Sequence, residues 1–170
     1  MKKLIYLIAL FLGFTSFAQG TLHIYNYSSY DIEGRLFANS LTNCTPEVFT
    51  FYKVPAGTMA DIKSFNLSNL ANPPINSWAV RTSTPVMNIP VPSGLLITMG
   101  NLARWHFYWF RTKVAGTSID TGDPAFNMGD QHFCGDTTSQ DYIYGVVTEA
   151  KWYYDSIMDI PEQTVHPIPV

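Results

Sequence analysis

The feature that most constrains this chain is an aromatic stretch in its second half, Ala103 to Val114. Five aromatic side chains lie within the six residues from Trp105 to Phe110. Aromatic and β-branched residues favour extended backbone, and the stretch is short and flanked by glycines. We therefore predict a β-strand around which the rest of the chain packs.

Both faces of this strand are expected to be buried. Alternation places Trp105, Phe107 and Trp109 on one face and His106, Tyr108 and Phe110 on the other. A strand that is apolar on both faces is typical of the centre of a covered sheet. The alternative is an aromatic platform for sugar rings or a patch that seeks a membrane, because an exposed apolar surface of this size needs a partner.

The remainder of the chain has the pattern of an all-β protein. Short segments rich in aromatic and β-branched residues each end at Gly, Pro, Asn or Ser. We predict a single-domain antiparallel β-sandwich, jelly-roll or immunoglobulin-like, of about eight or nine short strands with one disulfide. Besides the aromatic strand, the predicted strands are residues 22–27, 30–38, 48–54, 78–82, 86–91, 95–99, 142–148 and 152–160, and residues 58–62 are expected to pair back across the turn at Pro55.

Prolines and asparagines mark the irregular parts. Residues 64–77 carry four asparagines and two adjacent prolines and predict a surface loop with at most one helical turn. Pro90 lies inside an apolar run, which places it on an edge strand or at a bulge. Residues 161–170 contain three prolines and predict an extended tail without a partner, so the folded domain is expected to span residues 19–160.

The chain begins with the pattern of a secretory signal peptide. Lys2 and Lys3 precede an apolar run, and Ser16-Phe17-Ala18 matches the small-x-small cleavage pattern, so we expect residues 1–18 to be removed. The alternative, an uncleaved membrane anchor, is disfavoured because the apolar run is shorter than the roughly 20 residues of a spanning helix. No cysteine stands at the cleavage point to carry a lipid.

This leader is similar to those of exported proteins of Gram-negative bacteria. The resemblance covers the leader alone and implies a location in the periplasm, at the cell surface or outside the cell. The formal net charge is −3, and removal of two leader lysines makes it more negative. The mature chain therefore has no electrostatic footprint for nucleic acid, and no transmembrane span is expected after cleavage.

Two cysteines, Cys44 and Cys134, follow the leader into an oxidising compartment. Neither cysteine has the spacing of a metal site, so we predict one disulfide between them rather than free thiols or half a metal site.

An acidic, glycine-rich region between residues 119 and 136 raises the question of calcium. Asp120, Asp123, Asp130 and Asp136 provide four carboxylates, the hard oxygen donors that Ca²⁺ prefers. Their spacing does not follow an EF-hand loop, and glycine with aspartate is also the composition of ordinary solvated turns. We therefore expect no cofactor, and calcium is the one candidate.

The chain has no nucleophile elbow, phosphate-binding loop or dinucleotide fingerprint. Four acidic residues on predicted strands or beside them, Asp31, Glu33, Glu47 and Asp61, would have to meet in space to act as a pair in a hydrolase. Acids on strands usually form a solvated face, so catalysis is not the expected role.

Three functions remain open from the sequence. The leading hypothesis is a contact function, as an accessory or structural subunit of a bacterial cell-surface or outer-membrane assembly, whose partners are other envelope proteins. The second is a carbohydrate-binding module that uses exposed aromatic rings, namely Trp78, Trp105 or Trp152, with calcium in the acidic loop. The third is a carboxylate-dependent hydrolase.

Overall fold

The computed structural model describes residues 20–168 except residues 41, 84, 132–133, 135 and 156–159, so the predicted leader lies outside the described residues. Within the described residues the chain forms eleven strands, one α-helix and one 3₁₀ helix. These elements are β1 (Leu22–Asn26), β2 (Tyr30–Ser40), β3 (Glu47–Val54), β4 (Met59–Ile62), η1 (Phe65–Leu70), β5 (Ser77–Arg81), β6 (Met87–Pro90), α2 (Gly94–Leu102), β7 (Ala103–Val114), β8 (Phe126–Gly129), β9 (Tyr142–Tyr144), β10 (Thr148–Asp155) and β11 (Ile160–Pro167).

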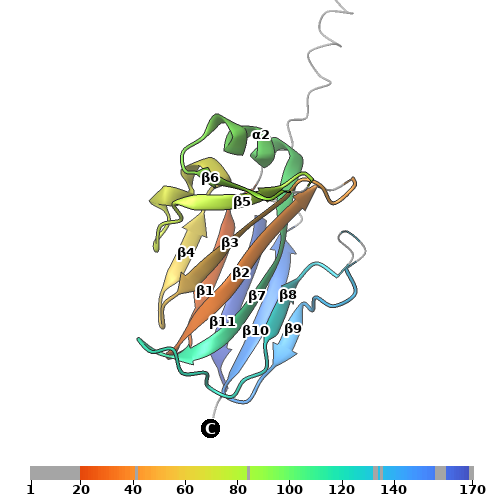
Figure 1. The fold of residues 1–170 in the computed structure, drawn as a ribbon. Coiled ribbons are helices and arrows are strands. Elements are labelled where there is room, and N and C mark those ends of the chain that lie inside the picture. The colour runs from red at the N-terminus through yellow and green to blue at the C-terminus, as the bar shows by residue number, and fades with distance from the viewer. Residues whose placement is uncertain are drawn as a thin grey trace, which may run out of the picture.

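The strands form two sheets that pack against each other (Figure 1). The five-stranded sheet has the order β4-β1-β11-β10-β9, and the six-stranded sheet has the order β6-β5-β3-β2-β7-β8. The pairs between named strands are antiparallel except β1 with β11, which run parallel. The prediction of a mostly β, sandwich-like protein is confirmed.

The core lies between the sheets and takes every second residue of each central strand. Leu22 and Ile24 come from the five-stranded sheet, and Tyr108 and Phe110 come from β7 in the six-stranded sheet; all four are buried. A period of two along each strand produces this separation of inner from outer residues.

The aromatic strand is β7, but its two faces are not both covered. Ala103 and Trp105 are buried, and after His106 the buried residues are Tyr108 and Phe110, so the alternation changes phase. Phe107 pairs with Phe37 and Trp105 pairs with Ala38, which leaves His106 as the extra residue of a β-bulge. The bulge turns Phe107 and Trp109 to the outer face, where Trp109 is 42% exposed. The prediction of a strand buried on both faces is therefore wrong.

The segment 95–99 is a helix rather than the predicted strand. The Ser93 side chain accepts a hydrogen bond from the Leu95 backbone N–H at 3.3 Å and caps α2. Leu96, Met99 and Gly100 are the buried residues of α2, and this spacing of three and four is helical. The stretch Leu-Leu-Ile-Thr-Met is apolar at nearly every position, so periodicity alone did not distinguish the two forms.

The predicted C-terminal tail is also wrong for residues 161–167. These residues belong to β11, which lies between β1 and β10 in the five-stranded sheet. Gln163 and Val165 are buried, and the polar glutamine hides the alternation in the sequence. Pro161 and Pro167 lie near the ends of the strand, where proline is tolerated. The folded part therefore extends beyond residue 160.

Of the smaller predictions two hold, whereas β4 pairs with β1 in the other sheet and not back across the turn at Pro55 with β3. Residues 65–70 form a single 3₁₀ helix within the predicted loop, and Pro90 ends β6, an edge strand. The predicted strand 142–148 is divided instead between β9 and the start of β10, and β8 lies in a region where no strand was expected.

The disulfide is present as predicted. Cys44 and Cys134 are bonded, with 5.4 Å between their Cα atoms. The Asn39 side chain donates to the Cys44 carbonyl at 3.1 Å, which ties this loop to the end of β2.

Candidate functional site

The three tryptophans predicted to bind sugars are buried. Trp78 and Trp105 lie in the core together with Phe65, and Trp152 is likewise buried. The Trp78 indole N–H donates to the Ser68 hydroxyl at 2.9 Å, and that of Trp105 donates to the Gly20 carbonyl at 2.7 Å. A buried indole with a satisfied N–H is a packing element, so these three rings do not form an exposed platform.

Other aromatic residues gather on the outer face of the six-stranded sheet. We call this surface the ring face; its members are Arg35, Phe37, Phe49, Phe51, Phe107 and Trp109. Arg35 pairs with Phe51 on β3 and with Trp109 on β7, so the three side chains form one row across three strands. Phe51 is 63% exposed. The ring face is therefore open to solvent where Phe51 and Trp109 lie.

A second row of rings lies next to the first. The centroid of the Phe37 ring is 5.6 Å from that of Phe49 and 4.2 Å from that of Phe107, and both pairs are stacked. Neighbouring strands lie about 4.8 Å apart. Rings that stack across strands therefore stand upright on the sheet and present their edges outward, since their faces contact one another.

Ion pairs surround the ring face. The Arg81 guanidinium lies 5.5 Å from the Phe49 ring centre and pairs with Glu47 at 3.0 Å. On the other side, the Lys53 ammonium lies 2.7 Å from the Asp31 carboxylate. A surface of aromatic rings and arginine with ion pairs at its border matches the composition of protein interfaces, where aromatic residues and arginine are enriched.

The outer face of the five-stranded sheet differs in chemistry. It carries tyrosines with polar neighbours, and we call it the tyrosine face; its rings are His23, Tyr25, Tyr27, Tyr142, Tyr144, Tyr153 and His166. Tyr25 stacks on His23 and Tyr27 at 6.1 and 5.8 Å between ring centres, and Tyr27 stacks on His166 at 5.0 Å. The His23 Nδ1 atom lies 2.5 Å from the Asp61 carboxylate.

The four aspartates of the calcium hypothesis have separate roles. Asp120 forms ion pairs with Lys113 at 2.5 Å and Arg111 at 3.2 Å. Asp130 is exposed after β8, and Asp136 accepts hydrogen bonds from the Thr138 backbone and the Ser139 hydroxyl.

Asp123 accepts four hydrogen bonds from two other parts of the chain, residue 112 and residues 146–148. Burial alone would raise the pKa of Asp123, but hydrogen bonds from Thr148, Val147, Thr112 and Val146 outweigh burial and lower the pKa. Within the described residues, no three His, Cys, Asp or Glu side chains lie together in a way that would hold a metal ion.

The acidic residues of the hydrolase hypothesis are not gathered into one group. Asp61 lies in the five-stranded sheet, whereas Asp31, Glu33 and Glu47 lie in the six-stranded sheet. Lys53 pairs with Asp31, and Lys113 lies 3.7 Å from Glu33. Burial opposes ionisation of Asp31, but hydrogen bonds from Lys53 and from the backbone of Gly116 and Ala56 outweigh it and lower the pKa, which keeps this carboxylate ionised.

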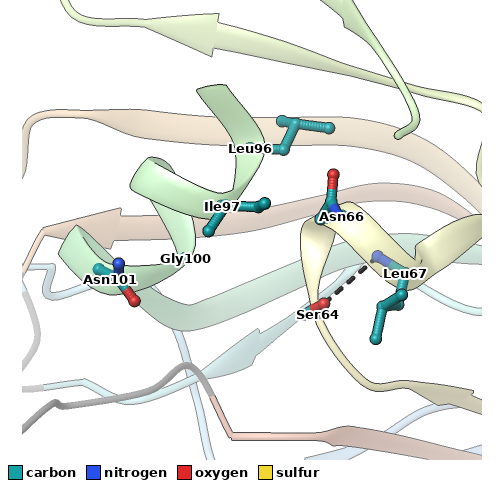
Figure 2. A pocket seen from close by; sticks show the side chains of 7 residues that line it. All are labelled: Ser64, Asn66, Leu67, Leu96, Ile97, Gly100 and Asn101. Atoms are coloured by element: carbon teal, nitrogen blue, oxygen red, sulfur yellow. Dashed lines mark hydrogen bonds between the residues drawn. The ribbon is translucent and has the colours of Figure 1, made fainter. Parts of the chain in front are cut away.

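A hollow of about 290 Å³ lies between η1 and α2 (Figure 2). Its wall is mainly apolar and includes Leu67, Leu96 and Ile97. The Asn66 side chain accepts from the Ser93 backbone N–H at 2.7 Å and joins η1 to the start of α2.

No protein-family model, curated protein or solved structure matches this chain. None of the helices in the described residues has the length and apolar character needed to cross a bilayer. The function is therefore argued from the surfaces themselves.

The sequence does contain a signal for the ring face, in the alternation of β3. Phe49 and Phe51 alternate with buried Val48 and Tyr52, so two phenylalanines point outward. Alternation alone did not predict that Trp109 is exposed while Trp105 is buried, because the bulge at His106 changes the phase of β7.

Proposed function

We propose that this protein acts by contact, as an exported accessory or structural module that binds another envelope protein through the ring face. The row formed by Phe51, Arg35 and Trp109 carries this proposal, because exposed aromatic residues and arginine are the types that dominate binding energy at protein interfaces. The leader, with its resemblance to those of exported Gram-negative proteins, supports a location at the cell surface or in the periplasm.

The order already present in the ring face favours tight binding. Phe37 is held between Phe49 and Phe107 by stacking, so these rings lose little side-chain freedom when a partner arrives. Upright rings leave no broad ring faces for sugars, which favours a protein partner on this surface.

The test compares a ring-face variant with a matched control. Trp109→Ser removes one exposed ring from the ring face, and Tyr144→Ser removes one from the tyrosine face, where Tyr144 is 60% exposed. Cross-linking in intact envelopes should identify a partner that binds the wild-type and Tyr144→Ser proteins equally. Loss of a hot-spot ring should weaken binding of that partner to the Trp109→Ser protein by roughly tenfold or more. A protein that stays monomeric and without a partner would contradict the proposal, as would equal binding by the Trp109→Ser protein.

Carbohydrate binding is a second candidate, which we propose for the tyrosine face. The exposed rings of Tyr144 and Tyr153, which lie on this face outside the stacked column, support it, because tyrosine combines an apolar ring with a hydroxyl that bonds to sugars. Glycan arrays with calcium and with a chelator test this candidate and the calcium hypothesis together. Binding that Tyr153→Ser abolishes would support it, and an empty array would remove it.

Two narrower statements stay predictions. One is the jelly-roll or immunoglobulin-like arrangement, which is a finer statement than two packed sheets. The other is a carboxylate-dependent hydrolase, which requires two acids about 5 to 9.5 Å apart in one cleft.

A further inference from the structure

The helix α2 lies at one end of the molecule and packs against η1 (Figure 1). Aliphatic side chains of both helices are exposed there. We call this end the apolar end; its exposed residues are Leu67, Leu70, Leu95, Ile97 and Leu102. Leu70 is 72% exposed and Ile97 is 56% exposed. Of these residues, Leu67 and Ile97 line the hollow between η1 and α2 (Figure 2). A protein seldom leaves several neighbouring leucines in water without a partner.

The apolar end is almost free of charge. From Ser64 to Ala103 the sequence holds a single charged residue, Arg81. The Arg81 side chain pairs with Glu47 and lies over Phe49, at the edge of the ring face. Binding at the apolar end would therefore be driven by the burial of hydrocarbon side chains and not by ionic attraction.

The predicted leader joins the chain at this same end. The first described residue, Gly20, accepts the hydrogen bond from Trp105, which follows α2 by three residues and contacts Phe65 of η1. Ala18 precedes Gly20 by two residues, so at most about 7 Å of chain separates them. Until the predicted cleavage after Ala18, a leader held in the bilayer would bring the apolar end to the lipid surface.

We propose that the apolar end docks on the surface of a lipid bilayer, independently of the ring face. The leucines and Ile97 enter the boundary between head groups and acyl chains, and the hollow between η1 and α2 accepts hydrocarbon. The large exposed side chains of this end are aliphatic, with the smaller polar Asn69, Thr98 and Asn101 among them. None of them is the Tyr, Trp or Arg that is typical of a protein interface, which favours lipid over a second copy of the chain. Because η1 and α2 carry no charged residue, docking needs no anionic lipid and persists at high salt.

Flotation of the exported, processed protein with lipid vesicles tests this proposal. Vesicles of phosphatidylcholine alone and of phosphatidylcholine with phosphatidylglycerol should carry the protein upward equally, at low and high salt. Ile97→Lys places a charge in the apolar end and should weaken binding by roughly tenfold or more. The matched control is Ile119→Lys, because Ile119 is 65% exposed beyond the opposite end of β7 and should not contact lipid.

A second charge variant, Leu70→Lys, tests the same surface from η1. It should act like Ile97→Lys, because Leu70 is the more exposed of the two residues and belongs to the same apolar end. Circular dichroism confirms that each variant is folded. No flotation of the wild-type protein overturns the proposal, and so does an equal loss with Ile119→Lys. Self-association that Ile97→Lys disperses, without vesicle binding, also overturns it and would assign the apolar end to a second copy instead.

Discussion

Gly34 occupies a position in β2 at which the six-stranded sheet has no room for a side chain. A Cβ atom there would lie 1.9 Å from the Trp109 carbonyl oxygen and 2.5 Å from the Phe110 Cα atom. Both atoms belong to the backbone of β7, which cannot move without disturbing the pairing of β2 with β7. The glycine thus allows the aromatic strand to approach closely.

Substitution of Gly34 by alanine should destabilise the protein strongly. We expect a loss of roughly 3 kcal/mol or more in the free energy of unfolding, because overpacking against backbone cannot be relieved by a rotamer change. Gly94→Ala is the control, since a Cβ atom at Gly94 meets nothing within 4 Å. Chemical denaturation of both variants measures the difference, and equal stabilities would contradict this account of the close approach.

Asp123 is a second residue with a structural role, because it connects separate parts of the chain. Its carboxylate accepts from Thr112 on β7 at 2.8 Å, from Thr148 on β10 at 2.7 Å and from the Val147 backbone at 2.8 Å. The bonds to Thr112 and Thr148 cross from one sheet to the other. The ionised carboxylate therefore helps to hold the two sheets together.

The lowered pKa of Asp123 predicts a loss of stability in acid. Its pKa is lower in the folded than in the unfolded protein, so its contribution is present above the unfolded value of about 3.9 and is lost as the pH falls through the folded value. Asp123→Asn should reduce stability at neutral pH and flatten the acid limb of the stability curve. Denaturation curves from pH 7 downward, with the exposed Asp141→Asn as control, check this. An unchanged acid limb in the Asp123→Asn protein would contradict it.

At the scale of elements, α2 and β11 are two whose secondary structure local sequence patterns did not predict. The residues of α2 are apolar at most positions, which suits a buried strand as well as a helix; the Ser93 cap and the packing of Leu96 and Met99 favour the helix. β11 pairs along both edges, with β1 and with β10. Its prolines and its buried Gln163 conceal a strand whose stability comes from these distant partners.

The bulge in β7 has the largest consequence for function among the elements. Ala38 and Phe37 are adjacent in β2, whereas their partners Trp105 and Phe107 are separated by His106. The His106 Nδ1 atom lies 2.9 Å from the Asn39 side-chain oxygen, and its Nε2 atom lies 3.6 Å from the Asp136 carboxylate. These contacts hold the bulged residue and so keep Trp109 on the ring face.

At the scale of the whole molecule, the disulfide joins two loops that are far apart in the sequence. Cys44 and Cys134 are separated by 90 positions, so the bond closes a long loop of the unfolded chain. Closing such a loop restricts the unfolded state far more than the folded state, in which Asn39 and Ser40 already hold the loop of Cys44 by hydrogen bonds.

Removal of the disulfide should therefore lower stability without changing the fold. For the double variant Cys44→Ser with Cys134→Ser, the chain-entropy model gives a loss of up to about 4 to 5 kcal/mol for a loop of this length. Thermal unfolding of the oxidised protein, the reduced protein and the double variant measures this loss. Identical transitions for all three would show that the bond adds nothing.

The sequence by itself determined the class of fold, the disulfide and the alternation of β2, because each depends on residue type and local spacing. In β2, for example, Ile32 and Leu36 face the core, whereas Glu33 and Arg35 face outward. Only the tertiary structure decided which aromatic rings face water. Burial depends on the partner strand and on the bulge at His106, and both are set by contacts between residues far apart in the chain. The three tryptophans that were predicted to bind sugars are consequently in the core. The ring face is built from residues of three different strands.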